Sequence, residues 1–213
     1  MLPATTTAVV LTLYLFVFFS INAQNIIRGI RLRKGNRSYA EVESPQGAAM
    51  ALTGLGTLAF YMETIGFIYL CLAGGSYYIH SSLLQLHLPH ESLLQVLGLT
   101  IVGVGVGVFL WSVTSRGRYS VSWSMPEDHR LVTWGPYRHV RHPSYLGYCL
   151  MFLGHALVHL NVIALLPLIA IPGYVTLSAK EEELLIERFG EEYLGYMETT
   201  GGFLPRFGIR KKN

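Results

Sequence analysis

The chain has 213 residues, of which 51% are hydrophobic and 14% are charged, and its mean hydropathy is +0.39. A typical soluble domain carries about 25% charged residues, so this composition excludes a disordered chain, argues against an ordinary cytosolic domain and indicates a small integral membrane protein. The formal net charge of +3 is too small to indicate a nucleic-acid partner. Cys71 and Cys149 lie inside apolar runs, where we expect buried thiols rather than a disulfide framework.

Three apolar runs in the first half of the chain predict membrane-spanning helices. Residues 3–23 carry no charge and are long enough to cross a hydrocarbon core of about 30 Å. Because basic residues follow this run instead of preceding it, we expect an uncleaved first span rather than a signal peptide. Residues 48–73, interrupted by Glu63, and residues 93–114 predict the second and third spans.

The third run is rich in glycine. Gly103 and Gly107 have small-xxx-small spacing, and Gly98 and Gly105 lie nearby. Glycines let helix backbones approach closely in lipid. We therefore predict that they pack helices together.

The last apolar stretch, residues 144–179, predicts a helical hairpin. As one helix it would extend about 54 Å, far more than a bilayer core. Two short helices with a tight turn near residues 159–161 fit better, and Pro167 and Pro172 are expected to kink the second one.

The basic residues predict how these spans cross the membrane. All 16 Lys and Arg lie in residues 28–37, 116–141 and 180–212, and residues 74–92 contain none. The positive-inside rule makes the three basic segments cytosolic and places the N-terminus outside. Two successive basic segments on one side require an even number of crossings between them, which independently predicts the hairpin.

The expected architecture is an all-α integral membrane helical bundle of about five transmembrane helices. We expect one membrane domain over residues 1–213, with three spans in residues 1–114. Residues 115–213 would form the cofactor-binding catalytic region, with the hairpin and a pocket that faces the cytosol. The histidines of the opposite loop, His80, His87 and His90, match no strong ligand pattern, so we expect a solvated loop and no metal.

Polar residues with recognisable chemistry collect in residues 115–148 and 180–205. The two arms of the hairpin have similar lengths, so His142 and Glu181 should be neighbours at the cytosolic face. Pro143 suits the first turn of a helix, whose free N–H groups form a seat for a carboxylate or phosphate. For Arg138 and Arg141 we favour contact with lipid headgroups.

The acidic residues Glu181, Glu182 and Glu183 follow the last apolar stretch, where helix ends and membrane faces both prefer cations. This placement favours binding of a cationic or hydroxyl-rich ligand, and a solvated acidic face is the alternative. Consecutive residues point in different directions, so we expect one or two of the three to face a pocket. After them, an aromatic and aliphatic stripe recurs at helical spacing and is expected to pack against the cytosolic loop. It consists of Ile186, Phe189, Tyr193 and Tyr196.

Three motifs in this region resemble the isoprenylcysteine carboxyl methyltransferase family, which is related to membrane phospholipid N-methyltransferases. They are HRLVTWGPY at residues 129–137, RHPSYLG at residues 141–147 and EEELLIERFGEEY at residues 181–193. The resemblance covers about the last 90 residues. It implies an all-helical enzyme that uses S-adenosylmethionine without a Rossmann fold, in agreement with the absence of a strand followed by a Gly-rich phosphate loop.

The resemblance also implies a set of cofactor contacts, which carries over position by position. The implied cofactor-binding residues are His129, Arg130, Leu131, Val132, Tyr137, His142, Pro143, Ser144, Tyr145 and Glu181. A tyrosine or Trp134 would be able to face the sulfonium by a cation–π contact.

Two positions depart from the family pattern. Leu177 stands where the family usually has an arginine thought to hold the carboxylate of the substrate, and Ser122 stands where a glutamine is usual. The cofactor site therefore looks intact, whereas the substrate site is altered. Arg116 and Arg118 are candidates to supply the missing charge.

The implied reaction is methylation of the C-terminal carboxylate of an isoprenylated cysteine, with a lipidated substrate that enters from the bilayer. A carboxylate is ionised at pH 7 and needs no general base, so no catalytic acid or base is assigned.

The alternative acceptors are a phospholipid amine or a small thiol, for which Glu63 or His155 would become candidate bases. The related sterol reductases use NADPH, whose 2′-phosphate would favour basic residues where this chain has glutamates. A transporter or scaffold is a further alternative, supported by the intramembrane Glu63.

Overall fold

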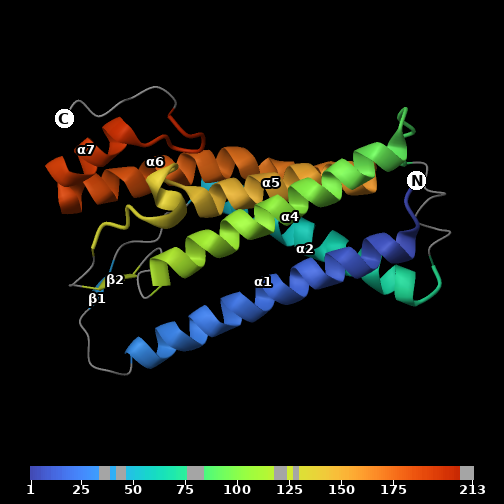
Figure 1. The fold of residues 1–213 in the computed structure, drawn as a ribbon, viewed down its shortest axis with the longest axis horizontal. Helices are drawn as coiled ribbons and strands as arrows, with labels where there is room; N and C mark the ends of the chain where they lie inside the picture. Colours follow the sequence, from blue (N-terminus) through green and yellow to red (C-terminus); the bar gives the residue numbers. More distant parts are fainter. Residues whose placement is uncertain (34–38, 42–46, 76–83, 118–123, 127–129, 207–213) are drawn as a thin grey trace.

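The computed structural model describes residues 1–33, 39–41, 47–75, 84–117, 124–126 and 130–206. These residues are almost entirely helical, apart from one short antiparallel pair of strands (Figure 1). The long elements are α1 (Ala4–Arg33), α2 (Ala48–Leu72), α4 (Glu91–Arg116), α5 (Pro143–His159) and α6 (Ala170–Phe189). The short ones are β1 (Tyr39–Glu41), β2 (Ser124–Pro126), α7 (Glu191–Thr199) and the 3-10 helices η2 (Gly135–Arg138) and η3 (Ile163–Ile169).

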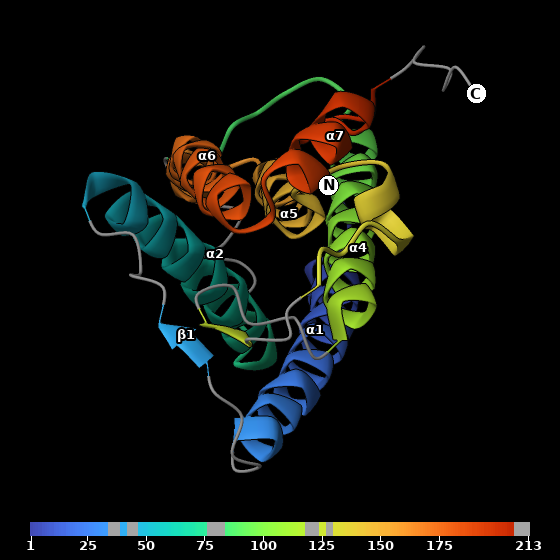
Figure 2. The same cartoon turned by 90° about the vertical axis from the view of Figure 1, so that its left-hand side faces the viewer.

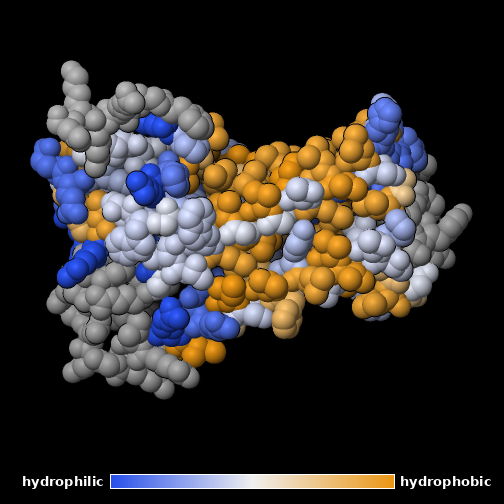
Figure 3. All heavy atoms as spheres, in the orientation of Figure 1, coloured by the Kyte–Doolittle hydropathy of each residue, from blue (hydrophilic) through white to orange (hydrophobic). Residues whose placement is uncertain are grey.

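The helices form a membrane bundle. Four helical stretches are long and apolar enough to cross a membrane, namely Ala4–Arg28, Ala48–Leu72, Glu91–Arg116 and Ile163–Phe189. The 17 residues of α5 lie at the short limit for a spanning helix. On the face seen in Figure 3, apolar residues cover most of the middle of the molecule, and hydrophilic residues lie toward both ends. The fold is therefore the predicted all-α, multi-pass bundle.

The order of the helices around the bundle is visible from its end (Figure 2). Helix α5 lies between α4 and α6, α2 packs beside α6, and α1 contacts both α2 and α4. The ends of α1, α4 and α6 that carry basic residues lie toward the same end of the molecule as α7 (Figure 1). This arrangement is the one that the charge pattern requires.

The predicted hairpin is confirmed. Helix α5 ends at His159, and Leu160 turns the chain with a left-handed φ of 46°. The amide of Gln85 donates hydrogen bonds to the carbonyls of His159 (3.2 Å) and Leu160 (2.9 Å). Carbonyls at the end of a helix need such partners, so Gln85 stabilises the turn from outside the hairpin.

The second arm of the hairpin differs from the expectation in two ways. Pro167 lies inside η3, whereas Pro172 lies in the first turn of α6, where a proline disrupts no helical hydrogen bond. Helix α6 then continues past Ala179 to Phe189. The acidic residues 181–183 are therefore inside a helix rather than after its end, and Gly190, with a φ of 53°, separates this helix from α7 and interrupts the predicted stripe.

Glycine pairs hold α4 against α5. A Cβ atom on Gly98 would lie 2.7 Å from the carbonyl oxygen of Gly154, and one on Gly105 would lie 2.7 Å from that of Gly147. On both helices the two glycines are seven residues apart, so they recur on one face. The predicted Gly103 and Gly107 do not form this contact. Gly103 packs against Tyr14 of α1, and a Cβ on Gly107 would meet open space.

We expect Gly105→Ala to lower stability, since the added methyl group must displace the backbone of α5. Overpacking of this kind costs about 1–3 kcal/mol. Thermal unfolding in detergent would measure the loss, and Gly107→Ala on the same helix is the matched control, with no loss expected. Equal melting temperatures for the two variants would contradict the close approach of α4 and α5.

Candidate functional site

The polar residues of the C-terminal motifs meet at the end of the bundle that carries α7 (Figure 1). Three segments contribute to this cluster. They are the start of α5 with the residues just before it, the second half of α6, and the chain that follows α7. The hairpin brings the first two segments together, because its two arms return to the same depth.

Arg141 connects all three segments. Its Nε donates a 2.8 Å hydrogen bond to Glu182 Oε1, and its Nη2 lies 3.4 Å from Glu182 Oε2. Its Nη1 donates to the carbonyl of Thr200, after α7. The side chain is only 10% exposed. Contact with lipid headgroups, which the sequence favoured for this arginine, is therefore wrong, and Arg141 is instead an internal clamp.

His142 lies between two carboxylates. Its Nε2 is 2.8 Å from Glu182 Oε1, and its Nδ1 is 3.6 Å from Glu181 Oε2. Burial alone would lower the pKa of His142, but the hydrogen bonds and negative charges of Glu181 and Glu182 outweigh it and raise the pKa. The interaction of protonated His142 with Glu181 and Glu182 therefore stabilises the folded protein fully below the unfolded pKa of about 6.5. This stabilisation is lost as the pH rises through the higher folded pKa.

Aromatic rings surround these charges. The hydroxyl of Tyr145 donates a 2.5 Å hydrogen bond to Glu181 Oε1, and its ring stacks on His142 with 5.7 Å between centroids. Phe203 covers the imidazole at 5.8 Å, and Tyr174 lies 4.9 Å from Tyr145. The carboxylate of Glu181 is thus hydrogen-bonded to a tyrosine and lies next to a cluster of aromatic rings.

The chain after α7 lies along the residues that precede α5. The backbone N–H of Arg141 donates to the carbonyl of Gly201 (2.8 Å), and that of His142 donates to Gly202 (3.1 Å). Thr200 and Gly201 are buried. These backbone bonds fix His142 at the start of α5.

The 3-10 helix η2 joins the cluster to the end of α4. The indole of Trp134 donates to the carbonyl of Ser115 (3.0 Å), and Gly135, with a φ of 61°, leaves no space for a side chain beside Ser115. This packing places Tyr137 beneath Arg116, whose Cζ lies 5.9 Å from the ring centroid. The carbonyl of Tyr137 in turn accepts a 2.5 Å hydrogen bond from Tyr196 of α7.

The structure brings together about half of the residues expected to contact the cofactor. His142 and Glu181 are neighbours, as the hairpin geometry predicts, and Tyr145 contacts both. Pro143 and Ser144 are buried in the first turn of α5. Tyr137 is buried, and this burial raises the pKa of its hydroxyl. The negative charge of Glu181 raises the pKa of Tyr137 further.

The other expected contacts lie on the segment that leads to η2. Val132 is buried against Tyr137, Leu131 is half-buried and Arg130 is exposed. His129, Ser122 and Arg118 lie outside the described residues. The assignment of these residues to a cofactor stays a prediction.

Sequence reasoning missed the role of Glu182 and of the chain after α7. Glu182 was one of three equivalent acidic residues, and only the fold shows that Glu181 and Glu182 face the cluster while Glu183 is exposed. Phe203 carried no signal, because it comes to His142 from 61 positions further along the chain.

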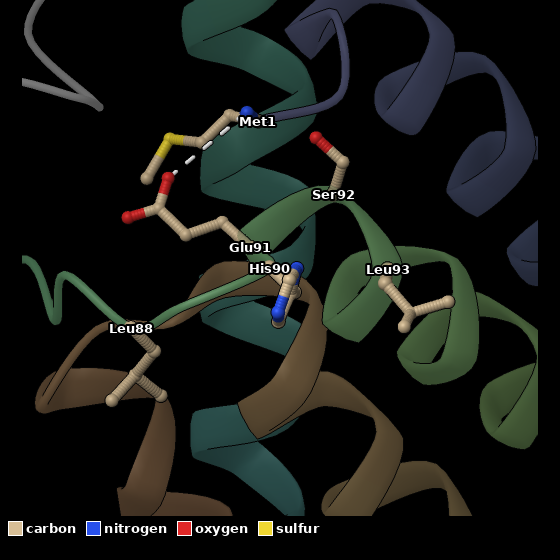
Figure 4. Close-up of a pocket in the computed structure, with 6 residues that line it drawn as sticks. All are labelled: Met1, Leu88, His90, Glu91, Ser92 and Leu93. Carbon is tan, nitrogen blue, oxygen red and sulfur yellow. Dashed lines mark ion pairs between the residues drawn. The ribbon is translucent and has the colours of Figure 1, made fainter.

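A surface pocket of about 470 Å³ lies at the opposite end of the bundle (Figure 4). Its lining residues are Met1, Leu88, His90, Glu91, Ser92 and Leu93. The amino group of Met1 lies 4.0 Å from Glu91 Oε2, the interaction marked by the dashed line in Figure 4. This pocket shares no residue with the cluster around His142.

Comparisons with known proteins cover the part of the chain that carries most of the polar cluster. Residues 93–192, which span most of α4 and all of α5 and α6, match the phospholipid methyltransferase family. The chain is 29% identical to the protein-S-isoprenylcysteine O-methyltransferase of Tribolium castaneum over 94 residues, or 43% of this chain and 33% of the relative. It is 38% identical to that of Saccharomyces cerevisiae over 80 residues, or 37% of this chain and 34% of the relative.

A plant relative matches over a longer stretch. Protein-S-isoprenylcysteine O-methyltransferase A of Arabidopsis thaliana is 28% identical over 113 residues, which are 51% of this chain and 57% of the relative. The matched part of the chain thus spans between a third and somewhat more than half of these three relatives. The fold and the cluster define an all-helical membrane protein with a polar site at one end. The C-terminal part that carries this site is similar to the phospholipid methyltransferase family and to protein-S-isoprenylcysteine O-methyltransferases, in agreement with its motifs.

Proposed function

We propose that this protein is an S-adenosylmethionine-dependent methyltransferase that methylates the C-terminal carboxylate of an isoprenylated cysteine. The observation that carries the proposal is the convergence of His142, Tyr145 and Glu181 at the end of the hairpin, within the segment that matches the family. The relatives, which are protein-S-isoprenylcysteine O-methyltransferases, support the same reaction.

The residues of the cluster fit a cofactor with a carboxylate, an ammonium group, hydroxyls and a sulfonium. A carboxylate has about four acceptor positions, so Glu181 retains capacity for an ammonium or a ribose hydroxyl beyond Tyr145 and His142. The hydroxyl of Tyr193 is buried without a hydrogen-bond partner among the described residues, and that of Tyr137 is buried close to Ser112 and Ser144. Polar groups therefore remain available for a bound molecule.

When bound, S-adenosylmethionine would supply an electrophilic methyl group for transfer to the acceptor oxygen. The chain itself has to bind and orient the two reactants. Glu181 would hold the cationic or hydroxylated part of the cofactor, and the N-terminus of α5 would hold its carboxylate. Arg141 and Glu182 would fix these groups in place, so catalysis would come from positioning rather than from proton transfer.

The proposed orientation places the polar cluster at the cytosolic face and the N-terminus outside. The basic ends of α1, α4 and α6 support it, since they gather toward one end of the bundle. A lipidated acceptor would then reach the cluster sideways from the bilayer.

One observation favours a different acceptor. Leu177, one turn before Glu181, is buried and only 3% exposed, and it offers no donor to a carboxylate. A phospholipid amine or a small thiol would need no such donor. Such acceptors have to lose a proton, so the rate of methyl transfer would rise with pH as the nucleophile deprotonates.

Purified protein incubated with labelled S-adenosylmethionine and three acceptors would test the proposal. The acceptors are farnesylcysteine, a phosphatidylethanolamine and a small thiol. We expect base-labile methyl ester on farnesylcysteine, at a rate independent of pH above about 6 because the carboxylate is already ionised. Transfer only to the amine or thiol would favour the alternative, and no transfer to any acceptor would contradict a methyltransferase.

Binding of the cofactor can be measured separately from turnover. We expect Glu181→Ala and His142→Ala to weaken S-adenosylmethionine binding roughly tenfold or more, since each removes a charge-assisted contact. Calorimetry on folded protein would measure it, with the exposed neighbour Glu183→Ala as the matched control. Unchanged affinity in both variants would place the cofactor elsewhere.

A further inference from the structure

The end of α4 carries a cation for which the described residues provide no acidic partner. Arg116 is the last residue of α4, and its Nε is buried with no hydrogen-bond partner among the residues that the structure describes. In the same part of the chain, Arg141 has Glu182 as its ion-pair partner. Arg116 therefore differs from Arg141, which is held in an ion pair.

A second buried donor lies beside it. The Tyr137 ring lies 5.9 Å from the Arg116 Cζ, and the residue is 7% exposed. Its hydroxyl makes no hydrogen bond of good geometry in the described part of the chain, although Ser112 and Ser144 lie close enough to lower its pKa. Burial raises the pKa of Tyr137, so the hydroxyl stays protonated and can donate. Tyr137 lies on η2, which leads directly to His142 at the start of α5, so this pair of donors lies on the segment that enters the proposed cofactor site.

The chemistry of the two groups defines what they can bind. A guanidinium has only donors, and a protonated phenol has one donor to offer. Leaving a buried donor unsatisfied costs about 1–3 kcal/mol, so such a pair is expected where a ligand supplies acceptors. A carboxylate is an acceptor-only group that matches the planar guanidinium.

We propose that Arg116 and Tyr137 form a carboxylate-binding subsite beside the cluster of His142, Tyr145 and Glu181. This inference rests on the proposed function and adds to it, because it assigns to the end of α4 the anion recognition that Leu177 of α6 cannot provide. The methyl acceptor and the cofactor both carry a carboxylate. The test therefore has to distinguish these two sources.

The test compares an acid with its ester. Binding of farnesylcysteine and of farnesylcysteine methyl ester is measured on purified protein in lipid nanodiscs, and binding of S-adenosylmethionine is measured separately. Arg116→Met keeps the aliphatic stem and removes the charge, and Tyr137→Phe keeps the ring. Arg138→Met is the matched control, because Arg138 lies on η2 but is exposed.

If the subsite holds the acceptor, the wild type prefers the acid, and Arg116→Met loses that preference by roughly ten- to a hundredfold while its affinity for the cofactor is unchanged. If it holds the cofactor, Arg116→Met weakens S-adenosylmethionine by a similar factor and leaves the acid preference intact. Tyr137→Phe should follow Arg116→Met with a smaller effect, and Arg138→Met should match the wild type.

Unchanged affinities for the acid and for the cofactor in a folded Arg116→Met protein would overturn the subsite. Failure of the proposed function would look different, since the wild type itself would then bind neither farnesylcysteine nor S-adenosylmethionine. The binding readout does not depend on turnover, so the two failures are distinguishable.

Discussion

Glu182→Ala should lower the free energy of unfolding by about 3 kcal/mol and weaken binding of S-adenosylmethionine, although Glu182 need not touch the cofactor. The Glu182 carboxylate accepts hydrogen bonds from Arg141 and His142, both at 2.8 Å, and these two side chains are 10% and 5% exposed. Its removal would leave two nearly buried cations without their shared partner. The start of α5 and α6 would then lose one of the contacts that join them, and Arg141 would keep only its backbone partners.

Thermal and denaturant unfolding in detergent would measure the loss of stability, and calorimetry would measure the cofactor. Glu183→Ala is the control on the adjacent position, where an exposed side chain should change stability by less than about 0.5 kcal/mol. Glu182→Gln should fall between the two, because it keeps an acceptor but removes the charge. Equal stability of Glu182→Ala and Glu183→Ala would show that the cluster does not depend on this carboxylate.

The hairpin was predictable because two independent constraints lead to it. The stretch before Lys180 is too long for one span, and the basic segments on both sides of it must face the same way. These constraints fix the number of crossings and the depth of the turn. They therefore also predict that His142 and Glu181 are neighbours.

The end of α6 was not predictable from the same constraints. Lys180 and the acidic residues after it have the composition of a segment outside the membrane, but helix α6 continues to Phe189. Glu181 and Glu182 are satisfied by Tyr145, His142 and Arg141, which come from about 40 positions earlier in the chain. The partners of these acids come from a distant part of the sequence, so their arrangement depends on the tertiary fold.

The glycine contact and the role of Arg141 were missed for a related reason. Four glycines of α4 are all compatible with close packing, and the partner helix decides that Gly98 and Gly105 make the contact with α5. Arg141 has the sequence context of a headgroup-binding arginine, and its true partners are Glu182 and the carbonyl of Thr200. A sequence pattern gives the face of a helix but not the element that will cover it.

A second polar contact lies inside the membrane part of the bundle, between α2 and α5. Glu63 Oε2 is 2.8 Å from His155 Nε2, and the imidazole is completely buried. The hydroxyl of Thr64 lies 3.4 Å from the other ring nitrogen, and the ring of His159 lies 4.4 Å away. His155 lies about 20 Å along α5 from His142. This distance argues against Glu63 or His155 as the base for a reaction at the polar cluster.

We therefore expect the pair to stabilise the bundle without taking part in methyl transfer. Glu63→Leu should destabilise the protein by about 1–3 kcal/mol, because it removes the partner of the buried His155 Nε2. The double variant Glu63→Leu, His155→Leu should recover part of this loss, since two apolar side chains need no partner. Thermal unfolding of the single and double variants would give the coupling between the two residues.

Methyl transfer per folded molecule should stay within about twofold of the wild type in all of these variants, since an effect on stability alone leaves the folded site unchanged. A large drop in turnover at unchanged stability, together with a new dependence of the rate on pH, would instead assign Glu63 and His155 to the reaction.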